Sequence, residues 1–167
     1  MLFRSLPVRP WFIFFSLFVA VALNFLPTAH WPAMPDWVAL VLCFWSVRES
    51  RRVGMGWAFV LGLAMDVADG AVLGQHCFAY VLLAYTSTAL SRRLLWFPLG
   101  TQALQVLPLL LATQAMQALM RLAAGAEFPG WGYFIGPFVA TLLWVPATFI
   151  LLLPQYRPVE QDPHRPL

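Results

Sequence analysis

The chain has 167 residues, of which 61% are hydrophobic and 10% are charged. A soluble domain carries about 25% charged residues, so this composition excludes an ordinary water-soluble protein and favours the lipid bilayer as the solvent. The net charge of +3 comes from ten arginines that flank apolar runs rather than gathering on one face, so it gives no reason to expect nucleic acid as a partner.

Six apolar runs, separated by short gaps, predict six transmembrane helices in one domain, 1–153. A span needs about 20 residues to cross ~30 Å of hydrocarbon. In chain order the predicted spans cover about 11–28, 35–48, 54–69, 76–91, 99–122 and 131–153. The second, about 14 residues or ~21 Å, is short enough to be tilted or partly re-entrant. The tail, 154–167, is rich in proline and charge and is predicted to be a disordered cytoplasmic segment.

The arginines predict which side of the membrane each gap faces. Short cytoplasmic loops carry an excess of Lys and Arg. Nine of the ten arginines fall in every second gap: Arg4, Arg9, Arg48, Arg51, Arg52, Arg92, Arg93, Arg157 and Arg165. The rule therefore places both termini in the cytoplasm and makes the second run a short crossing. The exception is Arg121, beside an otherwise uncharged or acidic outer gap.

The third run carries small residues at a spacing that allows close helix packing. Gly54, Ala58, Gly62, Asp66 and Gly70 follow one another at four-residue intervals. Small residues at such intervals let another helix approach closely, so these positions are candidates for helix packing or partner binding. Asp66 is ionisable, and such a residue in a span indicates function by default. The alternatives are an interior structural pair, a ligand or partner contact, and a carboxylate that reaches the outer interface or caps the following turn.

The fifth run carries amides on one face, and its outer end falls at the same depth as Asp66. We therefore expect a polar cluster in the outer third of the membrane. Its candidate members are Asp66, Asp69, Gln75, His76, Gln114, Gln117 and Arg121. Pairing of Arg121 with Asp66 or Asp69 would explain the arginine that breaks the alternation.

The sequence favours binding over chemistry. It contains no nucleophile elbow, no zinc-protease motif and no phosphate-binding glycine loop, and its three histidines show no metal-ligand spacing. We therefore expect neither a catalytic site nor a cofactor or metal.

The third and fourth runs resemble the rod shape-determining protein MreD family. The family pattern is loosely F-x-x-G-L-x-x-D, followed by L-G and a helix that begins with small residues. The matching segments are Gly56–Asp66, Gly70, Leu73–Tyr80, Pro35–Trp45, Arg51–Gly54, Arg92–Arg93 and Gln102. The resemblance extends over essentially the whole chain and is densest in 32–106.

The resemblance implies a non-enzymatic protein of the bacterial inner membrane that belongs to the cell-elongation complex. Its implied partners are an MreC-type bitopic protein and, indirectly, MreB-type filaments and the SEDS glycosyltransferase with its penicillin-binding protein. The implied fold is similar to the six-helix substrate-binding subunits of energy-coupling-factor vitamin transporters.

Two hypotheses remain open at this point. In the first, the chain is a scaffold and regulator of lateral peptidoglycan synthesis whose small and amide faces receive a partner. In the second, it is a small-molecule or lipid-binding membrane subunit. The second predicts a pocket of a few hundred cubic ångströms with convergent polar groups.

Overall fold

The structure is a computed structural model that describes residues 9–26 and 34–155. In these ranges the chain forms six α-helices and no strand, which confirms the predicted all-α fold. The helices are α1 (Pro10–Asn24), α2 (Trp37–Arg48), α3 (Met55–Ala68), α4 (Gln75–Leu95), α5 (Leu99–Ala123) and α6 (Ile135–Leu152), with short 3-10 turns η2 (Trp131–Phe134) and η3 (Leu153–Gln155).

The helix bounds differ from the predicted spans mainly at three places. Helix α1 ends at Asn24, although the first span is predicted to continue to about residue 28. The fourth helix continues through the arginine pair to Leu95 rather than ending near residue 91. Arginine is a good helix former, and cations in a last turn interact favourably with the helix dipole. At the C-terminus, residues 154 and 155 belong to η3. The rest of the predicted tail, 156–167, and the predicted end of the first span, 27–28, lie outside the described residues.

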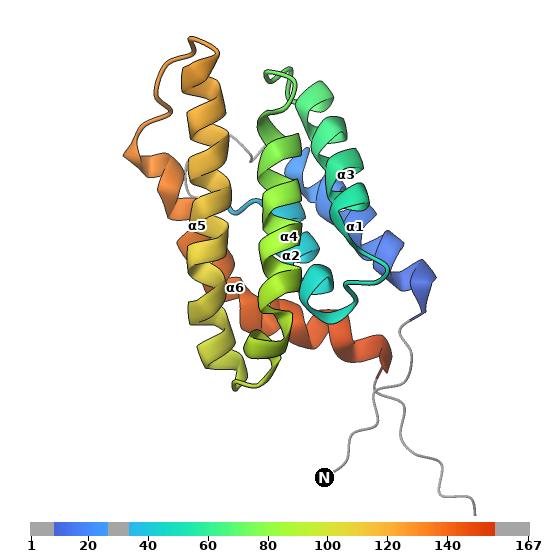
Figure 1. The fold of residues 1–167 in the computed structure, drawn as a ribbon. Helices are drawn as coiled ribbons and strands as arrows, with labels where there is room; N and C mark the ends of the chain where they lie inside the picture. Colours follow the sequence, from blue (N-terminus) through green and yellow to red (C-terminus); the bar gives the residue numbers. More distant parts are fainter. Residues whose placement is uncertain (1–8, 27–33, 156–167) are drawn as a thin grey trace, which may run out of the picture.

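Helix α4 lies at the centre of the bundle. It packs against α2, α3 and α5, while α1 packs on α2 and α5 packs on α6. Figure 1 shows α3, α4 and α5 side by side in front of α2, with α6 crossing behind them at the lower end. The α4–α5 connection lies at the lower end of this view, and the α3–α4 turn lies at the upper end.

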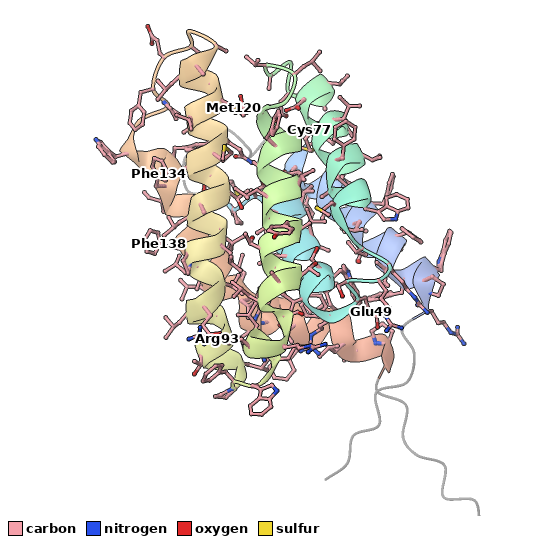
Figure 2. All side chains as sticks on the ribbon, in the orientation of Figure 1. Glu49, Cys77, Arg93, Met120, Phe134 and Phe138 are labelled. Carbon is pink, nitrogen blue, oxygen red and sulfur yellow. The ribbon has the colours of Figure 1, made fainter. Side chains whose placement is uncertain are left out.

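The two ends of the bundle carry different residues. In Figure 2, Glu49 and Arg93 lie toward the lower end, whereas Cys77 and Met120 lie toward the upper end. Glu49 directly follows α2 and is next to the arginine-rich α2–α3 connection. The structure therefore brings two of the arginine-rich segments to the same end.

Helix α2 is the core of the molecule. Ten consecutive residues, Val38–Val47, are buried. A helix that is apolar all round is buried on every side, which explains why this run shows no polar face. The indole of Trp45 donates a hydrogen bond of 2.8 Å to the hydroxyl of Ser16 on α1, so this buried N–H is satisfied inside the core.

The outer surface of the bundle is apolar. Large side chains stand exposed on several helices, among them Trp11 (78%), Phe18 (71%), Val67 (69%) and Leu142 (78%). Soluble monomers rarely expose contiguous apolar surface on this scale, so lipid is the environment that this surface fits. By length and composition α5 and the segment Trp131–Leu152 could each cross a bilayer, while α1, α2 and α3 are shorter apolar helices.

Candidate binding pocket

A pocket of about 570 Å³ lies between the α3–α4 turn, the last turns of α5, η2 and the segment that leads into α2. Exposed residues such as Asp69 and Ala126 line it together with buried ones, so it reaches the surface of the bundle. Six of the seven residues of the predicted outer polar cluster line this pocket: Asp69, Gln75, His76, Gln114, Gln117 and Arg121. Their part in binding stays a prediction.

Asp36 lies at the base of the pocket, the pocket floor, and its carboxylate accepts hydrogen bonds from several helices. As the N-cap of α2, it accepts a hydrogen bond from the backbone N–H of Ala39 at 3.0 Å on Oδ1. The same oxygen accepts from the amide of Asn24 at 3.1 Å. The hydroxyl of Tyr80 lies 2.9 and 2.8 Å from Oδ1 and Oδ2, and the amide of Gln117 donates to Oδ2 at 3.3 Å. One carboxylate therefore links the end of α1, the start of α2, α4 and α5.

The depth of Asp36 explains why a pocket exists. Tyr80 is five residues into α4, or about 8 Å from its first residue at 1.5 Å per residue. Gln117 is six residues before the end of α5, or about 9 Å. Because both side chains reach Asp36, α2 begins well below the ends of its neighbours. The short second helix thus leaves a space above its N-terminus.

The 3-10 turn η2 contributes Tyr133 to the pocket lining, beside Gln114 and Gln117 of α5. The hydroxyl of Tyr133 donates to Oε1 of Gln117 at 2.6 Å, and the amide of Gln114 donates to the carbonyl of Tyr133 at 2.8 Å. Just beyond, a Cβ on Gly136 would lie 2.8 Å from the carbonyl oxygen of Met34. A glycine is therefore needed for α6 to approach the segment that leads into α2.

Asp66 caps helix α4 rather than lining the pocket. Its carboxylate accepts hydrogen bonds from the backbone N–H groups of Gly74 (2.8 Å), His76 (2.7 Å) and Cys77 (3.4 Å). The first N–H groups of a helix have no partner within it, and the helix dipole favours an anion there. A buried charge requires such partners, and Asp66 is only 1% exposed. Of the predicted alternatives, this geometry is that of a structural cap.

His76 lies between two carboxylates. Its Nδ1 is 2.9 Å from Oδ1 of Asp66, and its Nε2 is 3.7 Å from Oδ2 of Asp69. Its ring also meets that of Tyr80 edge to face at 5.7 Å between centroids. The imidazole is therefore fixed in orientation between the buried cap and the more exposed carboxylate at the rim.

The predicted pairing of Arg121 is not formed. Among the described residues the ion pairs of Asp66 and Asp69 are both with His76, and Arg121 lines the pocket without an ion pair. The carboxylate of Asp66 is already saturated by the start of α4, which removes the reason for a cation to approach it. The guanidinium instead presents its charge at the pocket.

Gln75 is a buried amide without a partner. Its residue is 6% exposed, it lines the pocket, and among the described residues no hydrogen bond reaches its side chain. The amide atoms of Gln75 are not among the fully buried atoms without a partner, which in the described residues are Ser46 Oγ and Trp144 Nε1, so they are accessible from the pocket. The amide of Gln75 is available to a molecule inside the pocket.

The candidate packing residues fall into two groups. Ala58 and Gly62 are buried in α3. A Cβ on Gly62 would lie 2.5 Å from the Cα of Cys77, so the two helices cross there in backbone contact. Gly54 is instead the N-cap of α3, and Gly70 has a φ of 59° in the turn that follows it. A role of any of them in partner binding stays a prediction.

Sequence reasoning missed the residues that build the pocket floor. Asp36, Asn24, Tyr80 and Tyr133 were not among the candidates, although Asp36 directly precedes an apolar run, as N-cap aspartates do. That pattern predicts the cap but not the other donors. They come from segments up to 81 residues away in the chain.

The fold and the pocket define a class of protein. An all-helical bundle with an apolar surface and two helices suited to crossing a bilayer is a membrane protein, and polar side chains from several of its helices line one pocket. Pockets of this size with a few placed polar groups are typical of ligand-binding sites.

Comparison with known proteins gives the family. The model of the family described as rod shape-determining protein MreD matches residues 4–154. The rod shape-determining protein MreD of Haemophilus influenzae is 30% identical in an alignment 154 positions long, which covers 87% of this chain and 91% of the relative. The chain belongs to the MreD family. No solved structure matches it.

Proposed function

We propose that the protein is a non-enzymatic, multi-pass component of the bacterial inner membrane that helps to determine rod shape by regulating lateral peptidoglycan synthesis. The observation that carries the proposal is the match to the MreD family over residues 4–154. Membership of a rod shape-determining family supports a role in cell shape.

The proposed topology has six spans with both termini in the cytoplasm. Its support is the charge alternation in the sequence, together with the antiparallel course of the helices in Figure 1. The arginine-rich ends would then face the cytoplasm and the α3–α4 turn would face outward. A single cysteine at Gly100 and another at Gly125, labelled from outside with a membrane-impermeant reagent, should react at residue 125 only. Labelling at residue 100 would overturn the topology.

The proposed partner is an MreC-type bitopic membrane protein, through which the chain would act on MreB-type filaments and on the SEDS glycosyltransferase and penicillin-binding protein pair. The small residues Ala58 and Gly62 are buried within the chain, and the amides of Gln114 and Gln117 on α5 line the pocket. The partner must therefore use an outward face. The fold is proposed to be similar to that of the six-helix substrate-binding subunits of energy-coupling-factor vitamin transporters.

The test combines depletion with face mapping. Depletion in the host should turn rods into spheres, and an MreC-type protein should co-purify with the full-length chain. Tryptophan placed at an exposed position of α3 (Ala64), α5 (Ala112) or α6 (Leu142) should abolish co-purification at one face and leave it intact at the others. Normal rods after depletion, or co-purification that none of the three changes reduces, would overturn the partner proposal.

A second candidate function is supported by the pocket. The hypothesis of a small-molecule or lipid-binding subunit requires a space of a few hundred cubic ångströms with convergent polar groups, and a pocket of about 570 Å³ with such groups is present. The two functions are compatible, because the pocket lies inside the bundle and a partner would contact its outside. Loss of ligand binding with normal co-purification would separate them.

A further inference from the structure

The charges that line the pocket are of both signs. Asp36 and Asp69 carry carboxylates, and Arg121 carries a guanidinium that has no ion pair among the described residues. The carboxylate of Asp36 accepts from four donor groups, those of Asn24, Ala39, Tyr80 and Gln117, all of them neutral, so its negative charge is solvated but not neutralised. Oδ2 of Asp69 lies 3.7 Å from Nε2 of His76, and the side chain of Asp69 is 44% exposed.

This mixture decides which ligands the pocket can hold. A simple anion attracted by Arg121 would also face Asp36 and Asp69, and a simple cation attracted by the carboxylates would face Arg121. Like charges at a few ångströms in a partly buried site repel by amounts comparable to the attraction. A molecule that carries one group of each sign has no such conflict.

The side-chain amides of Gln75 and Gln114, which line the pocket, have hydrogen-bonding groups that no described residue uses. Gln75 is 6% exposed and has neither a donor nor an acceptor partner among the described residues. Gln114 uses its N–H on the carbonyl of Tyr133, and no described donor reaches its oxygen. The amide of Gln75 is accessible from a pocket that polar and charged side chains line, so its N–H and C=O groups can bond to a molecule in that space. The amides thus select a ligand with N–H or O–H donors.

We propose that this pocket binds a small zwitterion, a molecule that joins an ammonium group to a phosphate or carboxylate, with the anion on Arg121 and the ammonium toward Asp69 and Asp36. The proposal rests on the ligand-binding function proposed above and names its ligand class. The same chemistry occurs in a free amino-alcohol phosphate and in the headgroup of a zwitterionic lipid. The pocket, at about 570 Å³, is large enough for either.

The test uses the purified full-length protein and three soluble probes. O-phosphoethanolamine carries both charges, ethanolamine carries only the cation, and inorganic phosphate carries only the anion. Calorimetric titration should show that O-phosphoethanolamine binds at least about tenfold more tightly than either part, since one charge-assisted hydrogen bond exceeds that difference. Equal affinity for phosphate or for ethanolamine would overturn the proposed class.

Variants of pocket residues distinguish a specific binding site from nonspecific binding. Gln75→Leu removes an amide that has no partner within the described chain, so it should leave folding intact and weaken binding about three- to tenfold. The matched control is Gln105→Leu, the same change on α5 outside the pocket, which should bind as the wild type does. Arg121→Gln should weaken binding by about tenfold or more. Unchanged binding in both pocket variants would overturn the assignment.

A second arm identifies the source of the zwitterion. The protein is reconstituted in nanodiscs that contain equal amounts of phosphatidylethanolamine and phosphatidylglycerol, and retained lipid is measured by native mass spectrometry. Retention of phosphatidylethanolamine that Gln75→Leu abolishes and Gln105→Leu does not assigns a lipid headgroup. Binding of the soluble probe without lipid retention assigns a free solute, and either result supports the site. Failure of every zwitterionic probe overturns the ligand class but leaves the role in cell shape to its own assay.

Discussion

Replacing Gly62 by alanine should force α3 and α4 apart. A Cβ at this position would lie 2.5 Å from the Cα and 2.6 Å from the N of Cys77, and 2.8 Å from the carbonyl carbon of His76. These are backbone atoms, which cannot rotate away. To restore an ordinary contact of 3.4 Å, the helices must separate by about 0.9 Å, the difference between 3.4 and 2.5.

The energetic outcome is a balance of two terms. Alanine gains up to about 1 kcal/mol over glycine in helix propensity. Overpacking costs about 1–3 kcal/mol. The separation also stretches the cap one turn further along α3, where Asp66 holds the first N–H groups of α4 at 2.7 to 3.4 Å, and a lost cap costs about 1 kcal/mol more. We expect a net loss of about 2 kcal/mol in the free energy of unfolding.

The assay is thermal unfolding of the purified protein in detergent, with Gly56→Ala as the matched control. Gly56 is exposed on the same helix, and a Cβ there would meet nothing within 4 Å. Gly62→Ala should lower the apparent midpoint by about 4–8 °C in a chain of this size, while Gly56→Ala should leave it unchanged or slightly raised. Equal midpoints for the two variants would show that α3 and α4 do not cross in backbone contact.

Three further changes test the pocket floor and the cap. Tyr80→Phe removes the hydroxyl that contacts both oxygens of Asp36 and should destabilise the protein by about 1–3 kcal/mol. Tyr85→Phe should not destabilise it, because the ring of Tyr85 is exposed and makes no hydrogen bond among the described residues. Equal thermal midpoints for the two variants would contradict this prediction. Asp66→Asn turns an amide N–H toward the N–H groups at the start of α4 and should increase hydrogen exchange at residues 74–77, while Asp69→Asn should leave that protection intact. Gly70→Ala places a side chain at a φ of 59° and should cost about 1 kcal/mol by thermal unfolding; a stabilised variant would refute the left-handed turn.

Local rules predicted the elements of this protein well. Six apolar runs bounded by arginine, proline and glycine each hold one helix in the described residues, because a helix satisfies its own backbone and needs only a suitable run of residues. The small residues of the third run indicated close packing, and Ala58 and Gly62 are indeed buried in α3. The composition alone indicated a lipid environment.

What depends on distant partners was decided by the tertiary structure. The sequence suggested Arg121 as the partner of Asp66 or Asp69, because opposite charges at similar depth attract. The start of α4 instead supplies backbone donors to Asp66, and the ring of His76 lies beside both carboxylates. The importance of Asp36 could not be read from its neighbours in the chain. It follows from where α2 begins relative to α4 and α5, and that offset is set by how three helices pack. The apolar runs are thus a property of the sequence, while the pocket and its mixed charge exist only once a short, wholly buried α2 is packed among longer helices.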